Sequence, residues 1–86
     1  MWNDRLRIAE SVEAEWSALN EADRGEAFHA LEKIDEDPLA GTPLLGPLRG
    51  FWSYRIGVLR IIYRIVAEAR FIVILAINRV EETKKP

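Results

Sequence analysis

The stretch FWSYRIGVLRIIYRIVA, residues 51–67, decides the fold. It is rich in β-branched and aromatic residues, contains no proline, and is interrupted once, by Gly57 and Val58. Such a composition is typical of strands, and a two-residue loop that begins with glycine is typical of a type II′ hairpin turn. We therefore expect an antiparallel hairpin with strands at 51–56 and 59–67.

A third strand is expected at 70–78, after a turn at 68–69. With both turns so placed, Arg55 lies opposite Arg60, and Arg60 lies opposite Ile77. Residues directly opposite one another share a sheet face, and so do alternate residues of one strand. One face should then be apolar and pack on helices. The other face should carry a polar set, namely Ser53, Arg55, Arg60 and Arg79.

Two helices are expected before this sheet. The first is indicated by apolar residues at helical spacing, namely Val12, Trp16 and Leu19. Ser11 is its expected N-cap, and Asn20 is the expected N-cap of the second helix. The second helix has an apolar stripe of Ala27, Phe28, Leu31 and Ile34. It should end before Pro38, because proline disfavours helical geometry in the residue before it.

The remaining segments complete the expected fold class. Residues 38–50 carry three of the four prolines and three of the five glycines, which is typical of a loop. Residues 6–9 are a candidate short strand. We expect an α+β fold, in which an N-terminal helical hairpin, preceded by that candidate strand, packs on a three- to four-stranded antiparallel sheet.

The size and composition of the chain exclude several classes of protein and of site. A chain of 86 residues fits one domain, which we place at 1–86. It has no cysteine, so disulfides and thiolate metal sites are excluded. The longest apolar run is 71–77, whereas a membrane helix needs about 20 residues, and the N-terminus does not read as a secretory signal. We expect a cytoplasmic protein with no membrane partner.

The net charge of −2 hides an uneven distribution. Residues 1–43 hold four basic and eleven acidic side chains, whereas residues 44–86 hold eight basic and three acidic ones. This asymmetry indicates either an anionic partner for the basic half or simple attraction between the two halves.

The expected pairing of Arg55 with Arg60 favours an anion-binding face. Like charges in a direct cross-strand pair are destabilising unless something neutralises them. The alternative is that both side chains extend into water or bond Glu81 and Glu82. The same face also carries apolar side chains too extensive to leave bare on a soluble monomer. Either the first helix or a tail covers part of this face, or a partner protein does. We favour a partner helix or strand that covers a set including Ile62, Phe71, Val73 and Leu75.

These strands resemble the RelE/ParE family of bacterial toxins. The likeness rests on Leu-Arg-Gly at 48–50, on Trp-Ser-Tyr-Arg-Ile-Gly-Val-Leu-Arg-Ile-Ile-Tyr at 52–63, on the apolar strand at 72–75 and on Asn-Arg at 78–79. It is strong over 44–79, and the preceding helical hairpin agrees with it in kind and order.

The resemblance implies the toxin of a type II toxin–antitoxin pair, with a cognate antitoxin as partner. RelE-type members cut mRNA on the ribosome without a metal or other cofactor, by attack of the RNA 2′-hydroxyl on the adjacent phosphate. Arginines stabilise the charge that develops on the phosphorane. By this likeness Arg60, Arg79 and Arg55 are the catalytic candidates. The RNA-binding candidates are Arg49, Ser53, Lys84 and Lys85.

The sequence also departs from the RelE-type pattern. Lys85 stands where many members have a tyrosine or histidine, Ser53 stands where some have lysine, and His29 on the second helix is poorly placed for catalysis. A ribosome-dependent mRNA endonuclease is the leading hypothesis. A ParE-like inhibitor of DNA gyrase and an inactive, antitoxin-binding relative are the alternatives, with operator DNA reached only through the antitoxin.

Overall fold

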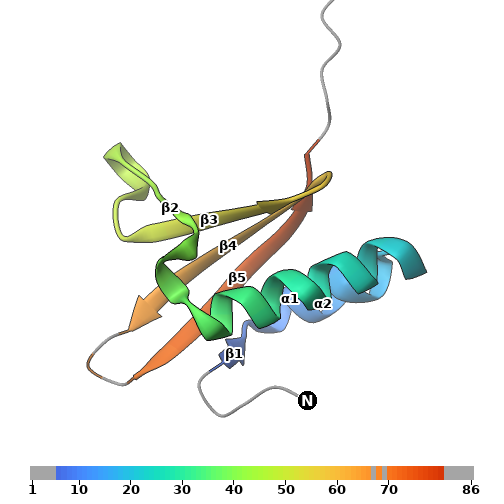
Figure 1. Cartoon of the computed structure of the whole chain (residues 1–86), viewed down its shortest axis with the longest axis horizontal. Helices are drawn as coiled ribbons and strands as arrows, with labels where there is room; N and C mark the ends of the chain where they lie inside the picture. The colour runs from blue at the N-terminus through green and yellow to red at the C-terminus, as the bar shows by residue number, and fades with distance from the viewer. Residues whose placement is uncertain (1–5, 67, 69, 81–86) are drawn as a thin grey trace, which may run out of the picture.

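The computed structural model describes residues 6–66, 68 and 70–80, which form a helical layer on a sheet (Figure 1). The helices are α1 (Glu10–Ala18) and α2 (Glu21–Glu36). The strands lie side by side in the order β1-β5-β4-β3-β2. Their bounds are β1 (Leu6–Ile8), β2 (Thr42–Pro43), β3 (Phe51–Ile56), β4 (Leu59–Val66) and β5 (Phe71–Arg79). Two short 3-10 helices, η1 (Pro38–Ala40) and η2 (Gly46–Leu48), flank β2.

The predicted α+β fold is confirmed, and the sheet extends further than the expected three or four strands. The candidate strand at 6–9 is present as β1, and it pairs in parallel with β5, so that Leu6 lies opposite Ile72. The loop at 38–50 contributes β2, which pairs antiparallel with β3 through Thr42 and Pro43. The described residues therefore form a mixed five-stranded sheet.

One of the two N-caps predicted from the sequence is confirmed. The Asn20 side chain accepts a hydrogen bond from the Asp23 amide at 2.8 Å, as an N-cap does. The assignment of Ser11 as N-cap was wrong, because α1 begins at Glu10 and the N-cap position is Ala9. The Ala9 amide donates to the Ile74 carbonyl at 3.0 Å, so the chain enters the helix directly from its pairing with β5.

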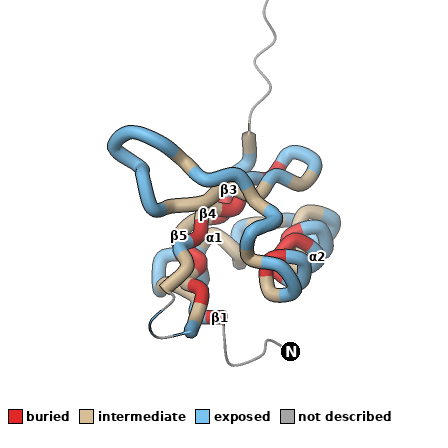
Figure 2. Tube along the Cα trace, turned by 60° about the vertical axis from the view of Figure 1, so that its left-hand side comes forward, coloured by how far each residue is buried: buried red, intermediate tan, exposed pale blue. Residues whose placement is uncertain are grey.

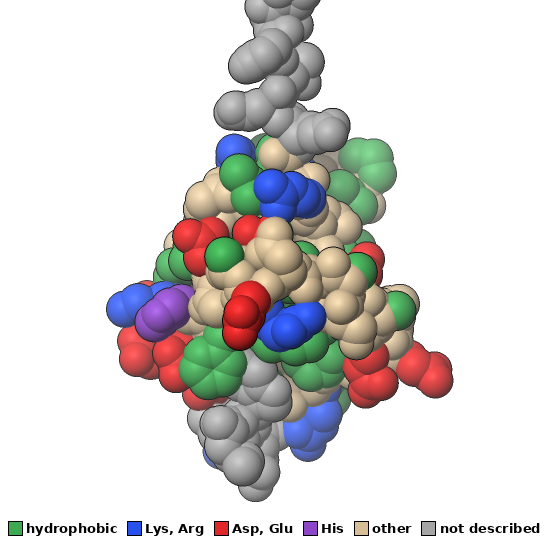
Figure 3. Space-filling view, turned by 90° about the vertical axis from the view of Figure 1, so that its right-hand side faces the viewer, with side chains coloured by type: hydrophobic (Ala, Val, Ile, Leu, Met, Phe, Trp, Pro, Cys, Tyr) green, Lys and Arg blue, Asp and Glu red, His purple; other side chains and the backbone are tan. Residues whose placement is uncertain are grey.

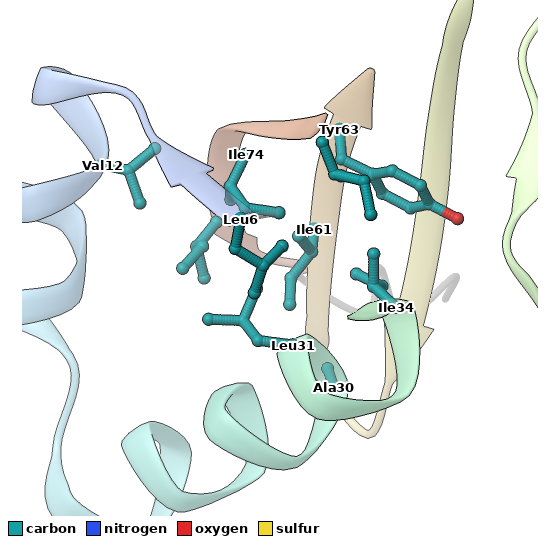
Figure 4. Packing of buried hydrophobic residues seen from close by; sticks show 10 residues of the cluster. Leu6, Val12, Ala30, Leu31, Ile34, Ile61, Tyr63 and Ile74 are labelled. Atoms are coloured by element: carbon teal, nitrogen blue, oxygen red, sulfur yellow. The ribbon is translucent and has the colours of Figure 1, made fainter. Parts of the chain in front are cut away.

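The core lies between the helices and one face of the sheet (Figure 2). Ile61, Tyr63 and Ile74 are fully buried on that face, and Leu31 and Ile34 of α2 pack against them (Figure 4). These are alternate strand residues, as the sequence predicted for the apolar face. No helix within the described ranges is long and apolar enough to span a bilayer.

The β3–β4 hairpin has the predicted register at every pair, including Arg55 opposite Arg60. Gly57 has a positive φ of 57°, and Val58 does not, as a type II′ turn requires. The β4–β5 register is as predicted from Val66 to Tyr63, which lies opposite Ile74.

Beyond Tyr63 the predicted β4–β5 register was wrong by one residue. Leu75 has no partner in β4, and the next pair joins Ile62 to Ala76. This β-bulge shifts all later pairs, because one extra residue on the bulged strand moves its side chains to the other face. Arg60 therefore lies opposite Asn78, and Ile77 is buried in the core with 3% of its surface exposed.

Candidate functional site

The sheet face that turns away from both helices, here called the outer face, carries two rows of arginine. The near row runs across three strands as Arg55, Arg60 and Asn78, which are direct cross-strand partners. All three are exposed. The pairing of Arg55 with Arg60 therefore places two positive charges side by side at the end of the sheet near the β3–β4 turn.

The far row lies four residues further along β4. Arg64 pairs with Phe51 of β3 and with Val73 of β5, and Val73 pairs in turn with Arg7 of β1. The sequence interpretation did not include Arg64 or Arg7 among the site residues. Arg64 shares the face of Arg60 by simple alternation, so that signal was available, whereas Arg7 joins the row only through a long-range parallel pairing.

The charge of the outer face is strongly one-sided. The five strands contain five arginines, four of them on the outer face, and no carboxylate, since the described Asp and Glu residues all lie in helices, loops or turns. Figure 3, which faces the end where the helical hairpin turns, shows several of these carboxylates at the surface. Arg55, Arg60 and Arg64 form no ion pair with any residue in the described ranges. The face is therefore suited to bind an anion.

Arg79 does not join this cluster, which corrects the predicted grouping with Ser53, Arg55 and Arg60. The bulge at Leu75 places it opposite Leu59, on the helix-covered face. There its guanidinium forms an ion pair with Asp23 in the first turn of α2, and 58% of the Arg79 side chain remains exposed. Arg79 thus links the end of β5 to α2.

The expected antitoxin-binding residues lie in the described sheet and are half-buried, namely Ile62, Phe71, Val73 and Leu75. Ile62 lies between the two arginine rows, and Leu75 is the bulged residue. Both helices pack on the opposite face, so these side chains form an apolar strip beside the arginines.

The expected RNA-binding residues are dispersed. Ser53 pairs with Ile62 between the two rows. Arg49 is exposed just before β3, beyond the far row. Lys84 and Lys85 lie outside the described residues. The structure therefore brings Ser53 alone of this group between Arg60 and Arg64.

Tyr63 has a structural role on the other face, as the sequence indicated. Its buried hydroxyl donates to the Pro38 carbonyl at 2.6 Å and accepts from the Gly41 amide at 3.2 Å, and Figure 4 shows it pointing out of the apolar cluster. Burial is the main cause that raises the pKa of Tyr63. A Cβ at residue 41 would lie 2.5 Å from this hydroxyl and 2.8 Å from the Ser53 carbonyl, so the loop needs glycine there.

Two further features lie on the helical side. His29 lies on α2, which packs on the face of the sheet opposite the outer face; its side chain is 73% exposed, with Nδ1 at 3.7 Å from Glu32. A cavity of about 590 Å³ opens between α1, α2 and β5. Its lining is mainly apolar and includes Trp16, Phe28 and Ile77. Neither feature brings a titratable group toward the arginine rows.

Comparison with known proteins gives a family match over nearly the whole chain. Residues 2–83 match the model of the ParE toxin of the type II toxin–antitoxin system parDE. No curated protein matches the sequence.

Solved toxin structures share the fold. The toxin–antitoxin complex RelBE2 of Mycobacterium tuberculosis matches with 26% identity and a TM-score of 0.80, covering 86% of this chain and 94% of that chain. The isolated Escherichia coli RelE toxin matches with 18% identity and a TM-score of 0.77, covering 92% and 86%. The archaeal RelE–RelB complex of Pyrococcus horikoshii matches with 20% identity and a TM-score of 0.70, covering 87% and 92%.

Proposed function

We propose a function for this chain, which belongs to the ParE toxin family and is the toxin of a type II toxin–antitoxin system. The proposal is that it inhibits translation as a ribosome-dependent mRNA endonuclease, active in the cytoplasm as a single domain over residues 1–86. It needs no metal or other cofactor.

The observation that carries this proposal is the near row of the outer face. Arg55 and Arg60 are adjacent, exposed and without a carboxylate partner in the described part of the chain. Arginine guanidinium groups bind phosphate through paired charge-assisted hydrogen bonds. An RNA phosphate bound between these two side chains relieves their mutual repulsion. In that position the scissile bond of the RNA lies on an open surface.

The chemistry that these residues support is charge stabilisation. The RNA 2′-hydroxyl loses its proton to water as its oxygen attacks the adjacent phosphorus, the bond to the 5′-oxygen breaks, and that oxygen takes a proton from water, so the products are a 2′,3′-cyclic phosphate and a 5′-hydroxyl. The phosphorane formed on the way carries more negative charge than the substrate. Arg60 and Arg55 stabilise that added charge, which is where preorganised donors act most strongly. Arg79 takes part only if its guanidinium leaves Asp23.

The cognate antitoxin is the proposed partner that silences this surface. RelE relatives are known in complex with antitoxins, and the outer face offers an apolar strip with Ile62, Phe71, Val73 and Leu75 beside the arginines. An antitoxin segment with apolar and acidic side chains fits both features. Operator DNA is then reached through the antitoxin, and raising the salt concentration weakens the complex.

The test is primer extension on a reporter mRNA after brief expression of the chain without antitoxin. The Arg60→Ala and Arg79→Ala variants are compared with Lys33→Ala, which removes one exposed charge from α2 on the opposite layer. Cuts within translated codons are expected for the wild type and for Lys33→Ala and are lost with Arg60→Ala and with Arg79→Ala. Full cleavage by either arginine variant contradicts the catalytic role assigned to that residue.

A second candidate is inhibition of DNA gyrase by binding alone. Two observations favour it. Arg79 faces α2 and pairs with Asp23, away from Arg60. The described strand residues of the outer face also include no histidine, tyrosine or carboxylate that could act as a general base. Growth arrest without mRNA cuts, together with loss of supercoiling by purified gyrase, supports this candidate. Absence of both cuts and arrest indicates an inactive, antitoxin-binding relative.

A further inference from the structure

We infer that the far row is a second backbone-binding site for single-stranded RNA, so that the substrate lies along β4 across both rows. This inference rests on the proposed function and deepens it, since it states how the RNA strand extends from the reacting phosphate. The residues that carry it are Arg64, Arg7, Phe51 and Phe71.

The spacing of the rows calls for an extended ligand. Arg60 and Arg64 are separated by four residues on the same strand face, which corresponds to about 13 Å. Strand side chains stand roughly perpendicular to the sheet. A ligand that engages both arginines therefore needs at least two anionic groups along β4, as a polynucleotide backbone provides.

The part of the outer face between the two rows, here called the floor, can accommodate a polynucleotide strand. The cross-strand partners there are Ser53, Ile62 and Ala76, none of them charged. Ile62 and Ala76 are half-buried, so their side chains protrude little from the sheet between the two arginine rows. A backbone can pass over this floor, with one phosphate at Arg60 and another at Arg64.

The far row is also aromatic, which favours nucleic acid over an acidic peptide. The Arg7 guanidinium lies over the Phe71 ring, with its carbon 5.0 Å from the ring centroid. Phe51 is half-buried directly beside Arg64. Unpaired bases of single-stranded RNA stack on aromatic rings and on guanidinium planes. An acidic peptide gains nothing from these stacking surfaces.

The test measures binding separately from cleavage. The ligand is a fluorescein-labelled 2′-O-methyl RNA hexamer, which cannot react because its 2′-oxygen is blocked. Its affinity for the purified chain is measured by fluorescence anisotropy over a range of salt concentrations. Arg64→Gln and Arg60→Gln are compared with Lys33→Gln, and hexaglutamate is the competing anionic peptide. All three positions are exposed, so each variant keeps the fold.

Arg64→Gln should weaken hexamer binding by roughly two- to fivefold, as the loss of one exposed charge contact does. The slope of log affinity against log salt should fall by about 0.7, the value for one phosphate contact on a single strand. Lys33→Gln should leave both quantities unchanged. Phe51→Leu should weaken the hexamer and leave hexaglutamate unaffected.

The outcomes separate this inference from the proposed function. An unchanged salt slope in Arg64→Gln, with a reduced slope in Arg60→Gln, overturns the far-row site and leaves the nuclease proposal intact. Tighter binding of hexaglutamate than of RNA also overturns it, in favour of an acidic protein partner. Weaker RNA binding and a reduced salt slope in Arg64→Gln, without any mRNA cuts by the wild type in cells, support the far row and contradict the nuclease.

Discussion

Replacing Tyr63 by phenylalanine should loosen the segment that leads from α2 into the sheet. The hydroxyl of Tyr63 holds two backbone groups of this segment, the carbonyl of Pro38 and the amide of Gly41. The ring itself is fully buried and stacks on Trp52, with 6.2 Å between the ring centroids. Phenylalanine keeps the ring and removes only the hydroxyl, so the change isolates these two hydrogen bonds.

The expected loss of stability follows from the count of hydrogen bonds. Each contributes a net of about 1 kcal/mol, and a buried group left without its partner costs about 1–3 kcal/mol. Pro38 and Gly41 are half-buried, so water reaches them in part once the hydroxyl is gone. We expect Tyr63→Phe to lower the free energy of unfolding by about 2 kcal/mol. Urea denaturation followed by tryptophan fluorescence measures this value.

Tyr54→Phe is the matched control. Tyr54 of β3 lies on the same face of the sheet as Tyr63 and packs against the core, and its hydroxyl forms no hydrogen bond with the described residues. Its removal should change the free energy of unfolding by less than about 0.5 kcal/mol. Equal losses in the two variants, or no loss in Tyr63→Phe, would refute the view that the Tyr63 hydroxyl anchors the loop.

Tyr63 should also make the free energy of unfolding depend on pH in the alkaline range. Burial raises the pKa of the Tyr63 hydroxyl above its ordinary value of about 10. Below that value the residue is protonated in both states and pH has no effect through it. Above that value the unfolded tyrosine ionises first, so the free energy of unfolding falls by up to about 1.4 kcal/mol per pH unit until the folded pKa is reached. The difference between wild type and Tyr63→Phe should therefore shrink above pH 10, and a constant difference contradicts the shift.

Three further predictions concern the cap of α2 and two contacts between the helices and the sheet. Glu15→Ala should cost about 1–2 kcal/mol in unfolding free energy, because the Glu15 carboxylate accepts from the Ile77 amide at 2.9 Å, and Glu15→Gln should retain most of the stability. Asn20→Ala should cost about 1 kcal/mol through loss of the α2 cap, whereas Asn20→Asp should not. A double-mutant cycle of Asp23→Asn with Arg79→Gln should give a coupling of about 1 kcal/mol that weakens with salt, since the Arg79 side chain is 58% exposed even though that of Asp23 is only 14% exposed. Thermal or urea unfolding measures all three, and a coupling of several kcal/mol would contradict the screening of the pair through its exposed arginine.

The sequence sufficed for the β3–β4 hairpin because two independent signals agree there. Gly57 fixes the turn geometry, and the two arginines of β4, Arg60 and Arg64, mark the face that points away from the core. In β5 the second signal is missing, since every residue from 71 to 77 is apolar. Such a run does not reveal which residues face the core, so the extra residue at Leu75 leaves no trace in the pattern.

The site was predictable to the extent that it depends on local pairing. Arg55 and Arg60 follow from the hairpin register alone. Arg7 belongs to the outer face because β1 pairs in parallel with β5, and the partners are 66 residues apart in the chain, as for Arg7 and Val73. Short strands at that separation carry no turn signal that fixes their register, so periodicity cannot place them.

The bulge decides how the arginines divide between the two faces of the sheet. In the regular register Arg79 lies on the outer face with Arg60, where three arginines crowd one end with no carboxylate among the described strand residues. In the observed register Arg79 reaches Asp23 of α2, and the uncharged Asn78 takes the place beside Arg60. This exchange reduces the repulsion in the near row, because a neutral side chain replaces a third cation. The outer face then depends on Arg55, Arg60, Arg64 and Arg7 for its charge, and an anion that lies along β4 can contact both of its rows.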